Sequence, residues 1–431
     1  MRKFIVILFC TVCAFCANAA TIINDTETER VLYELITPIA RAADIDPARM
    51  KIHIINGDDF NAFVMGGEDI YIYTGLLREI RSPDALAAVV AHELGHTIGG
   101  HMAQMSSRME MEMKRAMVIQ ALGIGLMFAG GNPALGAGVL AGGSGVARQS
   151  LLAFSRDEER IADELGLKLL VRAGLPPDGF ITVFQQMSDM HSAIEAQINP
   201  THINHPLTSE RLANIRARIA ELHDSARNKK IPAKRVAQYE LVRAKLIGYL
   251  DVAMRVNTLY PESDKSDAAQ YARAIANMRT GKMDMAVKSA RNLSARNPNN
   301  PYFYELVGDL EYQLGDYDAA VAAYEHSLRI ITNAPQIETA LALVLIERGG
   351  AGDTARAADL CRRALLVEQM PITYWTLART FDASDGRADW AMAEYYNMNG
   401  DSKNAKKYAR RAREKLSPDT PEYKKSGDLV K

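Results

Sequence analysis

Small residues recur every 34 residues in the last third of this 431-residue chain. The matching pairs are Gly281 and Gly315, Ala286 and Ala320, and Ala274 and Gly308. A period of this length, with several positions in phase, is typical of stacked units that each contain two helices. Small side chains at fixed places let the two helices of a unit pack closely. The spacing therefore predicts an all-α solenoid here, with a non-repetitive helical bundle as the alternative.

The period is that of the tetratricopeptide repeat, and it predicts an array over residues 261–418. A third unit begins near Pro335, and Gly400 marks a fourth. Residues 226–260 are predicted to form a helical linker into the array, and residues 419–431 a polar tail. The concave face of such an array is a general surface for binding other proteins.

Residues 92–96 form the pattern HExxH. Residues four apart in a helix lie on the same face, so the imidazoles of His92 and His96 can bind one metal ion. The carboxylate of Glu93 then lies where it can take a proton from a water molecule at that metal. We predict a zinc site with His92 and His96 as ligands and Glu93 as the catalytic base. The alternative is an ordinary helix with exposed polar side chains.

Local signals place this pattern on a helix that follows a small sheet. Ser82 is a good N-cap, Pro83 suits the first helical position, and the helix is predicted to continue to His101. Three strands are predicted before it, at Lys51–Asn56, Asn61–Met65 and Asp69–Thr74. The last of these is expected to be an exposed edge, with which an extended substrate segment could pair.

Two histidines do not complete a catalytic zinc site, which usually has three protein ligands. The metzincin pattern would place a third histidine at position 102, where this chain has Met102. His101 is one position too early, so we predict that it has a structural role or supports a ligand. The metzincin interpretation is therefore excluded.

The third ligand can come instead from a later helix, predicted over residues 155–173. Glu159 and Asp163 are four residues apart in it and so share one face. We predict that Glu159 binds the metal and that Asp163 accepts a hydrogen bond from the non-ligating ring nitrogen of His92. Glu158 points to another face and is the weaker candidate. Without HExxH, the same residues would be taken as a solvated acidic first turn.

Residues 1–19 have the composition of a secretion signal. Arg2 and Lys3 precede an apolar run from Phe4 to Cys16, and an A-x-A cleavage site follows. The run is too short to span a bilayer as a helix. After cleavage only Cys361 remains, so the mature chain cannot form an internal disulfide. An exported protein of this kind is predicted to reside in a bacterial periplasm.

Charge and composition narrow the range of partners. The formal net charge is −1, and no block of basic residues is interleaved with aromatic ones. Nucleic acid is therefore not an expected partner. Residues 109–152 are rich in methionine and then in glycine. Such a segment suits a mobile lid, a buried helical hairpin or a peripheral contact with a membrane surface.

Together these features resemble the gluzincin metallopeptidases of the HtpX and Ste-type group, in particular its periplasmic branch with C-terminal repeats. The residues that carry the resemblance are Asn61-Ala62-Phe63, Gly75-Leu76-Leu77, His92-Glu93-Leu94-Gly95-His96, Ser155 to Asp163, and His205-Pro206 with Arg211. The resemblance implies an α+β zincin-type metalloprotease domain over residues 20–225, followed by the all-α tetratricopeptide-repeat solenoid. It also implies one Zn²⁺ per chain, with Glu159 as the third protein ligand.

The resemblance further implies roles for residues that follow the ligand helices. Either His205 or Arg211 would donate a hydrogen bond to the scissile carbonyl oxygen during cleavage. His205 would also bind the metal at its open position and so hold the enzyme latent, and His202 is a nearby competitor for that role.

The implied function is that of a periplasmic endopeptidase that degrades misassembled outer-membrane proteins and assists their assembly. The implied partners are unfolded or misassembled protein substrates and the outer-membrane β-barrel assembly machinery, which would bind the repeats. The alternative is a chaperone or assembly factor that works through the repeats while its protease site stays mostly latent.

Overall fold

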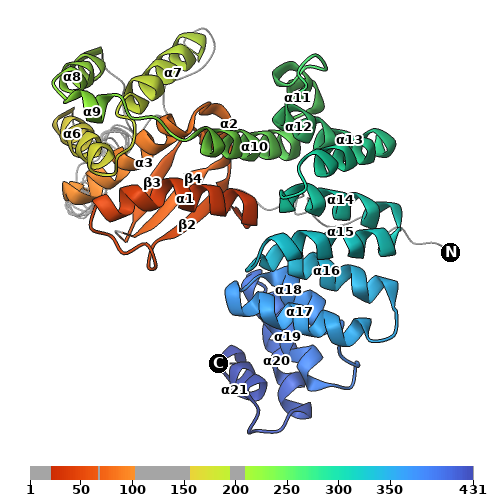
Figure 1. Ribbon diagram of the computed structural model, residues 1–431. Helices are drawn as coiled ribbons and strands as arrows, with labels where there is room; N and C mark the ends of the chain where they lie inside the picture. Colours follow the sequence, from red (N-terminus) through yellow and green to blue (C-terminus); the bar gives the residue numbers. More distant parts are fainter. Residues whose placement is uncertain (1–20, 67, 102–155, 195–208, 431) are drawn as a thin grey trace, which may run out of the picture. The chain divides into compact units, whose positions relative to one another are not determined.

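The computed structural model describes residues 21–66, 68–101, 156–194 and 209–430. The predicted signal peptide, the 109–152 segment and the loop with His202 and His205 lie outside these residues. The described chain divides into two compact units (Figure 1). Unit 1 extends to Arg235, and unit 2 comprises Val236–Lys431 together with the short segment Asn24–Val31.

Unit 1 contains a four-stranded sheet in the order β1-β2-β4-β3. Its strands are β1 (Thr21–Ile23), β2 (Lys51–Asn56), β3 (Ala62–Met65) and β4 (Asp69–Tyr73). β2 and β4 run parallel, whereas β1 with β2 and β3 with β4 are antiparallel. The three predicted strands are confirmed. β1 is additional to them, because three residues are too few to show an alternating pattern.

The edge of the sheet differs from the prediction. β4 was expected to be exposed at the edge, but β2 pairs with one side of it and β3 with the other. β3 is an edge strand instead, with Phe63 opposite Tyr71 and Val64 opposite Ile70. Gly66 has a φ of +65°, a left-handed conformation that suits glycine, and it turns the chain so that β3 lies outside β4.

The helices of unit 1 are α1 (Thr26–Ala42, whose residues up to Val31 belong to unit 2), α2 (Thr74–Glu79), α3 (Pro83–Ile98), α6 (Arg156–Arg172), α7 (Gly179–Ile194), α8 (Ser209–Ala220) and α9 (Asp224–Arg227). α1 runs alongside the sheet (Figure 1), and α3 packs against β3, α6 and α7. α3 begins after Ser82 as predicted but ends at Ile98 rather than at His101. The helix ends early because Gly99 and Gly100 follow, and Gly100 has a φ of +70°.

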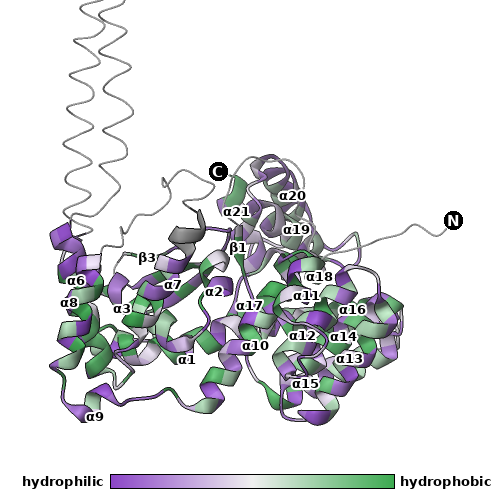
Figure 2. Cartoon of the chain, turned by 90° about the horizontal axis from the view of Figure 1, so that it is seen from above, coloured by the Kyte–Doolittle hydropathy of each residue, from purple (hydrophilic) through white to green (hydrophobic). Residues whose placement is uncertain are grey.

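Unit 2 is helical, and its helices carry hydrophobic and hydrophilic faces (Figure 2). They are α10 (Ala233–Leu250), α11 (Ala253–Leu259), α12 (Asp267–Arg279), α13 (Met283–Arg296), α14 (Pro301–Leu314), α15 (Tyr317–Ile330), α16 (Pro335–Arg348), α17 (Asp353–Val367), α18 (Pro371–Ala378), α19 (Gly386–Met398), α20 (Ser402–Lys415) and α21 (Pro421–Val430). Helices adjacent in sequence pack on each other as pairs, which confirms the predicted solenoid of paired helices.

The 34-residue period has a structural cause in unit 2. Gly281 and Gly315 join the two helices of their units with left-handed backbones, at φ values of +76° and +80°. A β-carbon added at Gly308 would lie 2.7 Å from the ring of Tyr324, and Ala320 is fully buried. The repeated small residues are therefore those at the turns and at the closest helix contacts.

Two segments beside the array differ from the sequence-based expectation. The predicted linker contains α10 and α11, which are separated at Asp251 rather than continuous. The predicted polar tail is instead the helix α21, in which Ser426 is buried. The guanidinium of Arg413 in α20 lies 4.6 Å from the ring centre of Tyr423, and this contact helps hold α21 in place. Among the described helices, none has the length and apolar character needed to cross a membrane.

Candidate metal centre

The HExxH residues lie on α3 and are withdrawn from solvent. His92, Glu93 and His96 are all buried. The Nε2 atoms of His92 and His96 are 3.1 Å apart, and the two rings are nearly perpendicular, at 87°. One turn of helix separates the two side chains, so both present Nε2 to the same point.

Glu159 on α6 completes the group. Its Oε2 lies 3.4 Å from Nε2 of His92, and its Oε1 lies 3.4 Å from Nε2 of His96. Two ligand atoms of a tetrahedral zinc site are separated by about 3.3 Å, given metal–ligand bonds of roughly 2.0–2.1 Å. The donor set of two imidazoles and one carboxylate, and its spacing, therefore fit zinc. Among the described residues, these three form the group able to hold a metal.

A close crossing of α3 and α6 brings Glu159 to the histidines. A β-carbon at Gly95 would lie 2.5 Å from the carbonyl oxygen of Ala162, and one at Gly166 would lie 2.9 Å from that of Ala91. The backbones of the two helices therefore touch without side chains between them. Sequence reasoning did not identify this role for Gly95 and Gly166. The available signal was a glycine within each motif-bearing helix, where glycine is otherwise unfavourable.

Asp163 occupies the predicted position behind His92. Its Oδ1 lies 2.9 Å from Nδ1 of His92, the ring nitrogen that points away from Glu159. Burial lowers the pKa of His92, but hydrogen bonds with Asp163 and Glu159 outweigh burial and raise this pKa to about 10. Metal binding requires the neutral ring, so a cation bound at Nε2 would compete with that proton. Asp163 can hold the tautomer that presents Nε2 to the metal.

Arg211 on α8 contacts both Asp163 and Glu159 of α6. Its Nε and Nη2 each lie 2.8 Å from one oxygen of Asp163, and its Nη1 lies 2.6 Å from Oε2 of Glu159. Burial raises the pKa of Asp163, but hydrogen bonds with Arg211 and His92 outweigh burial and hold this pKa below its ordinary value. Burial lowers the pKa of Arg211, but Asp163 and Glu159 raise it overall. The guanidinium thus forms ion pairs with two buried carboxylates.

Four further residues were predicted at or near the metal site: His101, Glu158, His202 and His205. His101 is buried, and its Nδ1 lies 3.0 Å from Nδ1 of His96. Glu158 is also buried, although the sequence had placed it on a different face from the ligands. His205 and its competitor His202 lie outside the described residues.

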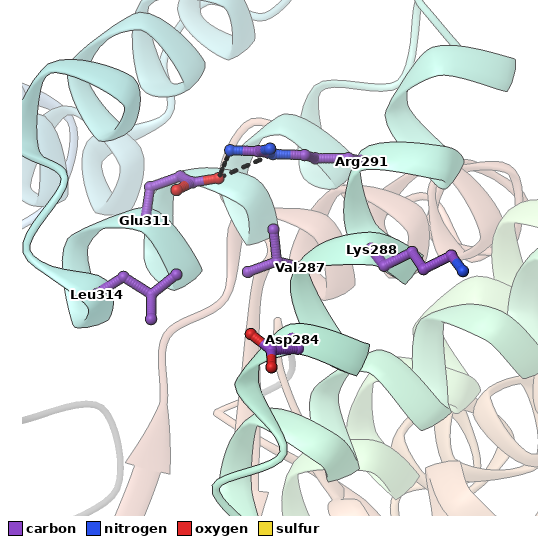
Figure 3. Close-up of a pocket in the computed structure, with 6 residues that line it drawn as sticks. All are labelled: Asp284, Val287, Lys288, Arg291, Glu311 and Leu314. Atoms are coloured by element: carbon purple, nitrogen blue, oxygen red, sulfur yellow. Dashed lines mark hydrogen bonds and ion pairs between the residues drawn. The ribbon is translucent and has the colours of Figure 1, made fainter.

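A hollow of about 500 Å³ in unit 2 is separate from these ligands (Figure 3). It lies between α13 and α14 and is lined by Asp284, Val287, Lys288, Arg291, Glu311 and Leu314. The guanidinium of Arg291 is paired with Glu311, at 2.6 Å, along one side of it. Val287 and Leu314 form its apolar part, and Lys288 points away from it (Figure 3).

Comparison with known proteins relates these features to a family. Residues 26–219 match peptidase family M48. The β-barrel assembly-enhancing protease of Escherichia coli is 26% identical over 397 residues, which cover 89% of this chain and 78% of that protein. Its counterpart in Yersinia pestis is 25% identical, covering 81% of this chain and 72% of that protein. Both similarities extend well beyond the residues of the family match, so they include part of the repeats.

Two further comparisons cover a smaller share of this chain, and one of them is a solved structure that superposes poorly. The mitochondrial metalloendopeptidase OMA1 of Saccharomyces cerevisiae is 27% identical over 176 residues, covering 40% of this chain and 47% of that protein. A thermophilic TPR protein from Thermus thermophilus is 17% identical and overlays at a TM-score of 0.27, covering 45% of this chain and 94% of that one. Because this TM-score is low, we infer the repeat architecture from the paired helices and the turn glycines of this chain.

Proposed function

The chain is a metallopeptidase whose residues 26–219 belong to peptidase family M48, and we propose that it is a periplasmic zinc endopeptidase acting in protein quality control. The convergence of His92, His96 and Glu159 on one point is the observation that carries this proposal. Each is held by a helix packed in the core of unit 1, so the ligands are arranged before a metal arrives.

The ligand set leaves one tetrahedral position open, as catalytic zinc sites do. Zinc, when bound by these three side chains, supplies Lewis-acid activation of the scissile carbonyl and of a water molecule. Glu93 follows His92 directly on α3 and is itself buried, so its carboxylate is suited to take a proton in a water-poor setting. In this proposal Glu93 accepts the proton of the attacking water and later passes it to the leaving amine.

The negative charge that develops on the scissile carbonyl oxygen needs a hydrogen-bond donor. Either His205 or Arg211 was predicted to be this donor. Arg211 directs its guanidinium nitrogens to Asp163 and Glu159. We therefore assign Arg211 to positioning these carboxylates, and we retain His205 as the proposed oxyanion donor and as the latch at the open metal position.

Substrate binding is proposed at the edge strand β3. The unpaired side of an edge strand offers backbone N–H and C=O groups that an extended peptide can pair with. β3 also packs against α3, so a peptide added there would run beside the ligand helix. Main-chain pairing discriminates little between side chains, which suits unfolded or misassembled protein.

The repeats are proposed to bind partner proteins. The Escherichia coli relative is named for enhancing β-barrel assembly, and by analogy we propose that this chain degrades misassembled outer-membrane proteins and assists their assembly. The repeats would bind the β-barrel assembly machinery. The N-terminal secretion signal predicted from the sequence supports a periplasmic site of action. Peripheral membrane contact through residues 109–152 remains a separate proposal.

Replacement of Glu93 by glutamine tests the mechanism. The variant should bind zinc as the wild type does but fail to cleave an unfolded outer-membrane protein, because the amide cannot accept a proton. Glu164→Gln, at a half-buried position of α6 that pairs with Arg218, is the matched control and should cleave normally. Cleavage by Glu93→Gln at the wild-type rate would exclude this mechanism.

The same variant separates the protease from the chaperone alternative. In a strain with an outer-membrane assembly defect that wild type repairs, loss of repair in Glu93→Gln indicates that proteolysis is required. Full repair by Glu93→Gln would instead favour a chaperone that works through its repeats. The inactive variant can also be used to capture uncut substrate from the periplasm.

A further inference from the structure

We propose that His101 is a positioning residue that orients the ligand His96, in the way that Asp163 orients His92. The inference rests on the zinc site proposed above. The sequence predicts that His101 either has a structural role or supports a ligand. In the structure its ring contacts one atom, Nδ1 of His96.

The contact joins Nδ1 of His101 to the ring nitrogen of His96 that faces away from the proposed metal position. Nε2 of His96 faces His92 and Glu159, whereas its Nδ1 lies 3.0 Å from Nδ1 of His101. The ring centres are 5.1 Å apart and the ring planes meet at 72°, so this is an edge-on contact rather than stacking. Only 1% of His96 and 2% of His101 are exposed, so water is excluded from this hydrogen bond.

The chain turns at the end of α3 so that the ring of His101 reaches His96. Gly99 and Gly100 stop the helix, and Gly100 has a left-handed φ of +70°. The ring of His101 then lies over Gly99, where a β-carbon would come within 2.7 Å of its Nε2. Any other residue at position 99 would displace that ring. The two glycines therefore explain both why α3 ends early and how a residue five positions after His96 reaches it.

The tautomers of both rings follow from this arrangement. If Nε2 of His96 binds the metal, its Nδ1 carries the proton and donates to His101. His101 must then accept through Nδ1 and carry its own proton on Nε2, so it is neutral. His92 has a charged acceptor in Asp163, whereas His96 has an uncharged one. A neutral acceptor orients His96 without adding another charge beside the buried Glu159 and Asp163.

A pair of substitutions at position 101 tests the role. The Oδ1 of asparagine can occupy the place of the histidine Nδ1, whereas leucine keeps the bulk and removes the acceptor. Chelator competition on the purified full chain should show zinc binding weakened by about 10- to 100-fold in His101→Leu. His101→Asn should stay within about threefold of wild type, as should the exposed control His223→Leu. Equal weakening in both position-101 variants would mean that the contact is only packing.

A second route displaces the ring without removing it. The φ of Gly99 is −69°, so its backbone accepts alanine, but the new methyl group must push the His101 ring away from His96. Gly99→Ala should weaken zinc binding, and the double variant with His101→Leu should be no weaker than the weaker single variant. Additive losses would overturn the proposal. The absorption spectrum of the cobalt-substituted chain should shift in Gly99→Ala and His101→Leu but not in His101→Asn.

The outcomes also distinguish this inference from the proposed function. Failure of the wild-type chain to bind zinc at its His92–His96–Glu159 site would overturn the function itself. Normal zinc binding by wild type together with unchanged affinity and spectrum in His101→Leu and Gly99→Ala would overturn only the role of His101. If His101→Leu fails to fold, the Gly99→Ala and His101→Asn variants still decide between the two results.

Discussion

Gly95 of α3 and Ala162 of α6 are in backbone contact, such that a β-carbon on Gly95 would lie 2.5 Å from the Ala162 carbonyl oxygen. Gly95 stands immediately before the proposed ligand His96, and Ala162 stands three residues after the proposed ligand Glu159. The separation of the two helices therefore sets the distance between the ligands that they carry.

Gly95→Ala should lower both zinc affinity and stability. The added methyl group meets backbone atoms, which cannot rotate away, so α3 and α6 must move apart and the ligands with them. Overpacking of this kind costs about 1–3 kcal/mol. Zinc titration and thermal unfolding with and without zinc measure the two effects. Gly427→Ala in α21 has an added β-carbon no closer than 3.8 Å to another group, so it should leave zinc affinity unchanged and should not lower stability.

Glu159→Gln should reduce the zinc content of the purified protein well below one ion per chain. The amide is a poorer ligand than the carboxylate, and it can no longer form an ion pair with Arg211. Elemental analysis after dialysis against a weak chelator provides the measurement. Glu164→Gln on the same helix, which pairs with the exposed Arg218, should retain the metal. Stoichiometric zinc in Glu159→Gln would argue against its assignment as a ligand.

Arg211→Met should destabilise unit 1 strongly. The substitution keeps an apolar stem against Phe184 but leaves Glu159 and Asp163 buried without their cation. Breaking a buried ion pair costs about 3–5 kcal/mol. Hydrogen exchange of the α6 amides reports the change locally. Arg172→Met removes an exposed pair with Asp44 in the same unit, and such pairs contribute about 0–1 kcal/mol. Similar effects of the two substitutions would contradict a central role for Arg211.

The stability of unit 2 should fall as pH rises from about 4.5 to about 8. Burial raises the pKa of Glu305 to about 8, although Lys245 opposes this, and burial raises the pKa of Glu27 to about 7. Both carboxyls keep a proton in the folded chain at pH values where the unfolded chain, with a pKa of 4.5, has lost it. Folding is therefore favoured at low pH, and this contribution is lost as pH rises through the folded pKa values.

Glu305→Gln tests the pH dependence, because glutamine cannot ionise. Exchange protection of the α14 amides, corrected for chemical exchange, should fall between about pH 5 and about pH 8 in wild type and change less in the variant. Asp359→Asn replaces an exposed carboxylate of α17 and should leave the wild-type dependence intact. An unchanged slope in Glu305→Gln would show that other groups control it.

Local sequence patterns were enough to predict the proposed metal ligands and the paired helices. The pairs His92 with His96 and Glu159 with Asp163 are each four residues apart, and a helix places such pairs on one face whatever surrounds it. The 34-residue period likewise predicted paired helices in the last third of the chain, and the structure shows that Gly281 and Gly315 lie at left-handed turns between such helices. The same local patterns failed where neighbours decide the outcome. They assigned an open edge to β4, and they missed β1 and the helix α21.

The sequence by itself determined which residue types could bind a metal and which helices carry them, because helical periodicity is a property of the chain alone. Only the tertiary structure decided that α3 and α6 cross at Gly95, that Arg211 turns to Glu159 and Asp163, and that His101 returns to His96. These relationships join segments whose separation in sequence carries no information about distance in space. They depend on which helices can approach without side chains between them, and that is settled when the core packs.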